Sequence, residues 1–130
     1  GDVVDDVLGD LRRSIEELVS AGVERSHVIV DPGIGFAKSG AQSLELLRNI
    51  STLRTEFALP VLIGTSRKSF IGAVTGESVD DRRFGTAATV ALAIQGGADI
   101  VRVHDVREMV SVVKMSDALT RQQRDGAIDA

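Results

Sequence analysis

Three short apolar runs along the chain each stop abruptly at polar residues, and amphipathic segments fill the intervals between them. These runs predict strands at 28–31, 60–63 and 100–103. Their apolar residues do not alternate with polar ones, which is typical of strands that are buried on both faces of a parallel sheet. Each predicted strand leads directly into side chains that can bind or donate, so the carboxyl ends of the strands are where chemistry is expected.

The intervening segments repeat apolar residues every three or four positions, which is the spacing of one face of a helix. The first such face consists of Leu8, Leu11, Ile15, Leu18 and Val19. Ser43 is the predicted N-cap of a second helix, which extends to Phe57. Further helices are predicted over 67–74, 87–94 and 106–119, with a loop over 75–81 and a frayed polar tail over 121–130.

The predicted elements follow the order α-β-α-β-α-β-α, and no linker or change of composition marks a second domain. This alternation predicts an α/β fold. Polar residues at the carboxyl ends of buried parallel strands are typical of a TIM (β/α)8 barrel. A complete barrel has about 250 residues. The 130 residues here therefore predict part of a single domain, 1–130, without the N-terminal half of its barrel.

Composition narrows the class of protein. The chain is 43% hydrophobic and 26% charged, which is typical of a globular domain, and it has no cysteine to form a disulfide or a thiolate metal site. The net charge of −4 argues against general binding to nucleic acid or to a membrane surface. No apolar run approaches the roughly 20 residues of a membrane span, and the expected location is the cytoplasm.

Asp31 is the first candidate for a binding residue. It ends a predicted strand and precedes Pro32 and Gly33, so a plain turn is as good an interpretation as a site. As a ligand, its carboxylate could accept two neighbouring N–H groups of a planar heterocycle. Gly33 and Gly35 would let that heterocycle approach the backbone, and Phe36 could form a wall of its pocket.

The segment Ser66-Arg67-Lys68-Ser69 lies between a predicted strand and a predicted helix. A capped, solvated loop is the simpler interpretation. The functional interpretation is an anion or ring site, because free N–H groups at the start of a helix attract a carboxylate or a phosphate. Ser69 would add a hydroxyl group, and Lys68 could reach a carbonyl oxygen or the ring face of the same ligand.

Arg102 and His104 flank Val103, so on a strand both would point to the same side. An arginine on a buried strand is costly unless it is paired, and a structural ion pair with Asp99 or Asp105 is one interpretation. The other, which we favour, is a pyrophosphate clamp in which Arg102 and His104 supply hydrogen-bond donors. Asp105 could orient His104 or cap the last helix.

Three motifs together resemble dihydropteroate synthases in their order and spacing. They are Asp31-Pro32-Gly33-Ile34-Gly35-Phe36, Gly64-Thr65-Ser66-Arg67-Lys68-Ser69-Phe70-Ile71-Gly72 and Arg102-Val103-His104-Asp105-Val106. The resemblance covers about residues 2–119 and corresponds to the C-terminal half of these enzymes, about strands six to eight of the barrel with flanking helices. The serine-arginine-lysine-serine block is the most specific part, since it separates the family from pterin-binding methyltransferases of similar fold.

The resemblance implies a transferase of folate biosynthesis. Such an enzyme condenses 6-hydroxymethyl-7,8-dihydropterin pyrophosphate with p-aminobenzoate, and sulfonamides compete with the aminobenzoate. The implied binding residues are Asp31 and Lys68 for the pterin, Phe36, Ser69 and Lys68 for the aminobenzoate, and Arg102, Val103 and His104 for the pyrophosphate. Of these, Lys68, Arg102 and His104 are the implied catalytic residues.

The same resemblance implies Mg²⁺ as a companion of the pyrophosphate. Its protein ligand is expected in the missing N-terminal part, with no metal ligand in residues 1–130. A full-length member is expected to be a homodimer, and the isolated chain is expected to be inactive. Two alternatives stay open, namely a pterin-dependent methyltransferase of the same fold and a non-catalytic half-barrel module.

Overall fold

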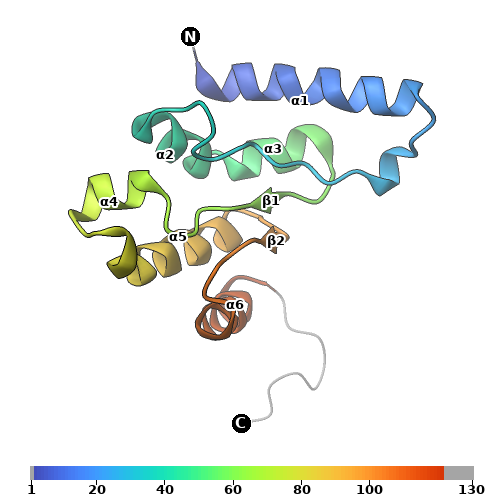
Figure 1. Cartoon of the computed structure of the whole chain (residues 1–130). Helices are drawn as coiled ribbons and strands as arrows, with labels where there is room; N and C mark the ends of the chain where they lie inside the picture. Colours follow the sequence, from blue (N-terminus) through green and yellow to red (C-terminus); the bar gives the residue numbers. More distant parts are fainter. Residues whose placement is uncertain (1, 122–130) are drawn as a thin grey trace.

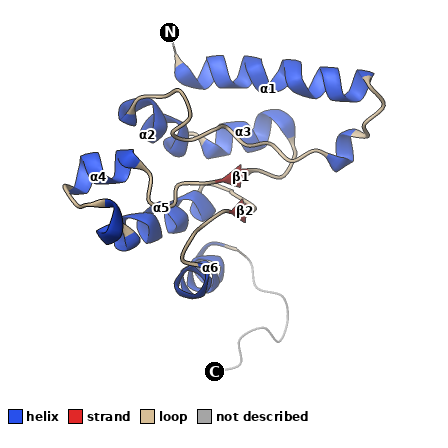
Figure 2. Cartoon of the chain, in the orientation of Figure 1, coloured by secondary structure: helices blue, strands red, loops and turns tan. Residues whose placement is uncertain are grey.

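Short strands lie at the centre of the molecule with helices packed against them. The expected burial on both faces is wrong for the last strand, where Ile100 is 37% exposed. The computed structural model describes residues 2–121. The helices are α1 (Val3–Ser20), α2 (Gly40–Arg48), α3 (Ile50–Phe57), α4 (Ser69–Thr75), α5 (Arg83–Gln95) and α6 (Val106–Thr120). The strands are β1 (Leu62–Ile63) and β2 (Ile100–Val101). Two short 3-10 helices are η1 (Arg25–His27) and η2 (Val79–Asp81). In Figure 2, α1, α2 and α3 lie on one side of the strands and α6 lies on the other.

The parallel orientation predicted from the apolar runs is confirmed. β1 pairs with β2 in parallel, with Ile63 opposite Val101. The extent of the first predicted strand, 28–31, is wrong, because only a single parallel bridge joins Val30 to Val61. The next ladder donor after Val30 on this strand would be Pro32, which has no N–H group, so the pairing stops there.

The third predicted strand, 100–103, is also shorter than expected. The Arg102 N–H group still donates to the Ile63 carbonyl at 3.0 Å. The next donor along the ladder, the His104 N–H group, binds the Ser66 hydroxyl oxygen at 3.0 Å instead. A side chain thus replaces the neighbouring strand as partner, and the chain leaves the sheet after Val101.

The single helix predicted from Ser43 to Phe57 is wrong in two respects. Its N-cap is Ser39, whose hydroxyl accepts the Gln42 N–H group at 3.1 Å while the Gln42 side chain accepts the Ser39 N–H group at 2.9 Å. This reciprocal capping box satisfies two otherwise unpaired donors. The helix is also interrupted at Asn49, because the side-chain amide of Asn49 donates to the Glu45 carbonyl at 2.8 Å and displaces the backbone bond.

The remaining helices lie near their predicted positions. α4 and α6 agree with the predictions to within one or two residues, whereas α5 begins at Arg83 rather than at Ala87. The predicted loop 75–81 contains η2. Arg121 ends α6 and donates from its backbone to the Asp117 carbonyl at 2.9 Å. The rest of the predicted tail, 122–130, lies outside the described residues.

The main core lies between α1, the α2–α3 pair and the strands. Its least exposed members are Leu46, Ile50, Leu53 and Val61. From α1 the core takes Val4, Val7 and Ile15. The predicted apolar face of this helix is wrong at Leu18 and Val19, which are 43% and 46% exposed, because the last turns of α1 extend beyond α3 (Figure 1).

A second, smaller core forms where α5 packs on α6, and it contains Val90, Ile94 and Met109.

Within residues 2–121, no helix combines the length and the apolar character that a membrane span requires.

Gly85 offers a test of how closely α4 and α5 pack. A Cβ atom on Gly85 would overlap Cγ2 of the buried Ile71. We therefore expect Gly85→Ala to lower the free energy of unfolding by about 1–3 kcal/mol, although alanine ordinarily favours a helix. Gly9→Ala in α1 is the matched control, since the nearest atom there is the flexible end of Arg13 at 3.6 Å. Urea midpoints should move in opposite directions, and a higher midpoint for Gly85→Ala would contradict the packing.

Candidate functional site

Three loops meet at the carboxyl ends of the parallel strands. They comprise 31–36 after Val30, 64–68 after β1 and 102–105 after β2. Two contacts tie them together. Arg102 Nη1 lies 3.6 Å from Asp31 Oδ2, and Lys68 Nζ donates to the Ile34 carbonyl. The three sequence segments singled out for chemistry therefore lie side by side.

A cavity of about 290 Å³ opens where these loops meet, and its lining consists of Gly64, Ser66, Lys68, Arg102, Val103 and His104. Four of the predicted site residues thus share one cavity. Asp31 is not part of the lining, but it contacts Arg102, which is. Phe36 is 62% exposed and lies beside Lys68, whereas Ser69 is exposed at the start of α4 and is not part of the lining.

The turn that was one interpretation of Asp31 is present in the structure. Its Oδ1 atom accepts the Gly33 N–H group at 2.8 Å, which is the hydrogen bond of an Asx turn. Its Oδ2 atom faces Arg102, and the side chain is 37% exposed. The carboxylate therefore shapes the turn, and its second oxygen faces a guanidinium that lines the cavity.

Ser43 and Lys38, which the sequence does not mark as functional, hold the first loop in place. Ser43 is almost fully buried in α2, and its hydroxyl accepts the Gly35 N–H group at 3.1 Å. Lys38 Nζ donates to the carbonyls of Gly33 and Phe36, both at 3.0 Å. No local motif signals these contacts, because each joins a polar side chain to the backbone of a loop that folds only in the complete structure.

Lys68 is the central cation of the site. Its Nζ atom lies 4.6 Å from the centroid of the Phe36 ring, which is within cation–π range. Its stem crosses directly over Gly35, where a Cβ atom would come within 2.9 Å of Lys68 Cδ. Burial lowers the pKa of Lys68, and the nearby positive charge of Arg102 lowers it further.

Arg67 fixes the loop that carries Lys68. Its φ of 56° is left-handed, a conformation that costs a residue with a side chain about 1 kcal/mol or more. Its N–H group donates to Thr86 Oγ1 at 3.0 Å, and its carbonyl accepts from Arg82 Nη1 at 3.0 Å. Its guanidinium holds Asp105 through two bonds, Nη2–Oδ1 at 2.7 Å and Nε–Oδ2 at 3.3 Å.

These two hydrogen bonds from Arg67 determine the role of Asp105. The hydrogen bond from Arg67 lowers the pKa of Asp105, and the same bond raises the pKa of Arg67. Asp105 stands at the N-cap position of α6, as one sequence interpretation expected, but it makes no side-chain capping bond there. The Nδ1 atom of His104 pairs with Ser66 rather than with Asp105, so the interpretation that Asp105 orients His104 is wrong. The ion pair that was the alternative interpretation of Arg102 does form, but its partner is Asp31 rather than Asp99 or Asp105, and Asp99 pairs with Arg54 at 2.9 Å.

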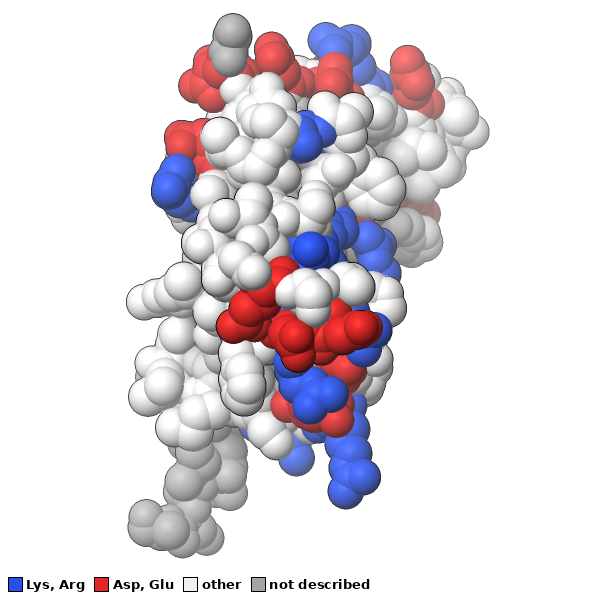
Figure 3. Space-filling view, turned by 60° about the vertical axis from the view of Figure 1, so that its left-hand side comes forward, with Lys and Arg blue, Asp and Glu red and all other residues white. Residues whose placement is uncertain are grey.

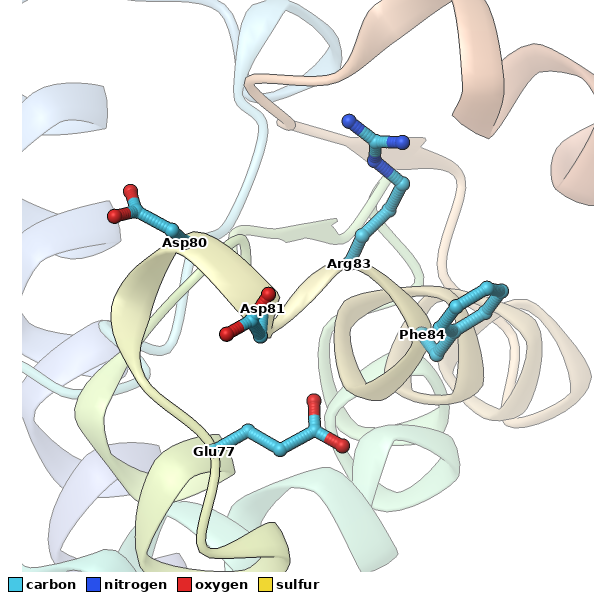
Figure 4. A pocket seen from close by; sticks show the side chains of 5 residues that line it. All are labelled: Glu77, Asp80, Asp81, Arg83 and Phe84. Carbon is cyan, nitrogen blue, oxygen red and sulfur yellow. The ribbon is translucent and has the colours of Figure 1, made fainter.

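A second pocket, of about 500 Å³, lies away from these loops, and its lining consists of Glu77, Asp80, Asp81, Arg83 and Phe84 (Figure 4). None of the predicted site residues lines it. Figure 3 shows acidic side chains gathered on this side of the molecule with basic ones beside them. Three carboxylates against one guanidinium make the pocket unsuited to an anion, in contrast to the cavity that holds Lys68 and Arg102.

Comparison with known proteins places residues 1–104 in the family of pterin-binding enzymes. The chain is 45% identical over 118 residues to the dihydropteroate synthase of Bacillus subtilis, a match that covers 91% of this chain and 41% of the relative. It is 41% identical over 125 residues to the folic acid synthesis protein fol1 of Pneumocystis carinii, covering 93% of this chain and 17% of that protein. The chain thus spans less than half the length of these relatives.

Solved structures give the same result. A dihydropteroate synthase from Clostridium difficile, crystallised with pteroic acid, superposes with a TM-score of 0.90 and 41% identity, covering 94% of this chain and 46% of that one. A Yersinia pestis dihydropteroate synthase in a sulfonamide complex gives a TM-score of 0.88 and 36% identity, covering 92% and 43%. The resemblance predicted from the three motifs is confirmed, and so is the coarser assignment of the fold to part of this TIM-barrel family.

The Arg67–Asp105 pair predicts a specific acid dependence of stability. Because the folded-state pKa of Asp105 lies below the usual value of 3.8, the pair stabilises the fold above that pH and the stabilisation is lost as pH falls through the lowered pKa. We expect Asp105→Asn to be less stable than wild type at about pH 7, with a difference that shrinks below about pH 4. Denaturant midpoints measured against pH provide the test.

Asp10→Asn is the control, because its partner Arg13 is 68% exposed and Asp10 itself is 72% exposed, so removing that pair should change little at either pH. Equal midpoints for Asp105→Asn and wild type at neutral pH would contradict the prediction.

Proposed function

Because this chain belongs to the family of pterin-binding enzymes, we propose that it is the site-bearing, C-terminal part of a dihydropteroate synthase, comprising about strands six to eight of its barrel. The reaction joins a dihydropterin pyrophosphate to p-aminobenzoate and releases pyrophosphate. One observation carries the proposal: the three loops converge on a cavity that holds two cations, with one carboxylate at its edge. The relatives' names support the substrate class.

The pterin is assigned to Asp31 and Lys68. The carboxylate of Asp31 can accept two adjacent N–H groups of a pterin ring, as a neutral or cationic side chain could not. It is held for this by Gly33 on one oxygen and by Arg102 on the other. Lys68 interacts electrostatically with this carboxylate and lies over the Phe36 ring, so it can contact both the pterin and the aminobenzoate.

The aminobenzoate is assigned to the outer part of the site. Phe36 offers an exposed aromatic face beside Lys68, and Ser69 offers a hydroxyl one residue further along the chain. An aromatic ring stacked near Phe36 would place its carboxylate within reach of the Lys68 charge. This arrangement matches a flat, amphipathic anion.

The pyrophosphate is assigned to Arg102, Val103 and His104. Arg102 is 56% exposed at the cavity, so its guanidinium can turn a planar fork of donors toward an anion. His104 contributes a further donor, and Val103 closes the wall between them. Because the protein has a net charge of −4, this cluster of cations is a local anion site in an otherwise acidic chain.

These residues suit a reaction that needs no protein nucleophile. The bond from the pterin methylene carbon to the pyrophosphate oxygen breaks with its electron pair on the oxygen, and the pterin ring delocalises the positive charge that is left. The amine nitrogen of p-aminobenzoate then bonds to that carbon and loses a proton. The chain contributes orientation and stabilisation of the departing negative charge.

Mg²⁺ is not assigned to residues of this chain. Among residues 2–121, no three histidine, aspartate or glutamate side chains gather as a metal site. The residues that the structure describes therefore do not fit a resident ion. We propose that Mg²⁺ accompanies the pyrophosphate and takes its protein ligand from the part of the enzyme that precedes this chain, and that the full-length enzyme is a cytoplasmic homodimer.

Inhibition by sulfonamides tests the proposed function. The enzyme to use is full length, with this chain inside a polypeptide as long as its bacterial relatives. We expect it to form dihydropteroate, with sulfonamide inhibition that added p-aminobenzoate relieves, because both ligands occupy one pocket. The isolated 130 residues should show no turnover above buffer. Activity that sulfonamides do not affect, or transfer of a methyl group instead, would contradict the proposal.

Substitution of the two cations tests their roles. We expect Lys68→Ala and Arg102→Ala each to lower kcat/KM about 100-fold, since a well-placed donor of this kind contributes about 3 kcal/mol. The urea midpoint should change little. Arg48→Ala, which removes an exposed arginine on α2 paired only with Glu45 at 3.4 Å among its described contacts, is the control. Wild-type kinetics in both cation variants would refute the assigned roles.

A further inference from the structure

Ser66 makes two hydrogen bonds to one residue on the neighbouring loop. Its side chain is buried after β1, with 7% of the residue exposed. The Ser66 Oγ atom lies 3.0 Å from the backbone nitrogen of His104 and 2.7 Å from Nδ1 of the His104 ring. The hydroxyl group therefore forms hydrogen bonds to both the backbone and the imidazole of His104, a residue that lines the cavity.

The available donors and acceptors fix the direction of these two bonds. The His104 N–H group can only donate, so it occupies a lone pair of Ser66 Oγ. The one hydroxyl proton of Ser66 then needs an acceptor, and within residues 2–121 Nδ1 of His104 is its remaining partner. If Nδ1 carried a proton instead, the hydroxyl proton of a buried serine would be left unpaired, which costs about 1–3 kcal/mol.

We propose that Ser66 is a positioning residue that holds neutral His104 in the tautomer with its proton on Nε2. Nδ1 accepts from Ser66, so the ring proton is on the nitrogen at the far side of the imidazole. Nε2 is then the donor of a residue that lines the cavity together with Lys68 and Arg102. This inference rests on the proposed function, because it names how one pyrophosphate ligand acquires its donor.

The consequence for an anion is direct. With the proton on Nε2, a neutral imidazole offers a hydrogen bond to a phosphate oxygen. With the proton on Nδ1, the same ring would present a lone pair to that oxygen and repel it. Ser66 thus lets His104 bind an anion without first being protonated, although the serine itself need not touch the ligand.

The first measurement is the tautomer itself. The ring nitrogens of His104 in the ligand-free full-length enzyme are observed by ¹⁵N NMR at about pH 8, above the usual imidazole pKa of about 6.5, and assigned by their loss in His104→Gln. We expect Nδ1 to show the shift of an unprotonated nitrogen and Nε2 that of a protonated one. Ser66→Ala should give mixed tautomers, and Ser66→Thr should restore the wild-type signals.

Wild-type His104 with its proton on Nδ1, or an unchanged tautomer in Ser66→Ala, would overturn the inference. Neither result depends on synthase activity, so failure here is distinguishable from failure of the proposed function.

The second measurement is the affinity for inorganic pyrophosphate, determined by calorimetry at the same pH. We expect Ser66→Ala to weaken binding about 10-fold, as for the loss of one donor to a charged group, and Ser66→Thr to bind as wild type does. A Ser66→Ala variant with mixed tautomers but unchanged affinity would overturn the positioning role. A wild-type enzyme with the Nε2 tautomer but no affinity for pyrophosphate would overturn the proposed function, and with it the role of Ser66.

Discussion

The two-pronged bond between Arg67 and Asp105 is the interaction on which the candidate site depends. The strands are too short to fix the loops that follow them, since β1 and β2 have two residues each. Arg67 fixes the loop after β1 instead, because its N–H group, its carbonyl and its guanidinium all form hydrogen bonds. Together these bonds offset the cost of a left-handed backbone and hold Ser66 and Lys68 on either side of it.

The same arrangement explains how cations can gather in an acidic protein. Lys68 and Arg102 repel each other, and the lowered pKa of Lys68 records part of that repulsion. Asp31 offsets it from one edge, and the aromatic face of Phe36 from another. Lys68 is also held by its hydrogen bond to the Ile34 carbonyl, so contacts within the chain keep the two cations close together.

How much the sequence could predict follows from which interactions are local. The apolar runs predicted parallel strands, and parallel strands bring their carboxyl ends to one edge, so the meeting of Asp31, Lys68 and Arg102 could be foreseen. The capping serine could also have been identified, because Ser39 has Gln42 three residues later, which is the sequence signature of a capping box, whereas Ser43 has Leu46 at that position. The pairing of Arg67 with Asp105 joins residues that lie 38 positions apart, and no periodicity or composition signals it.

Gly64 and Gly35 restrict the substitutions that the site can accept, because each lies against one of its cations. The guanidinium of Arg102 lies where a side chain on Gly64 would be, with Nη2 at 2.6 Å from the Cβ position, and Lys68 occupies the same space over Gly35. Both cations are thus pressed against bare backbone, and neither glycine can acquire a side chain without moving one of them. A substitution at either glycine would therefore change the site indirectly, through the cation that it displaces, rather than through a contact of its own.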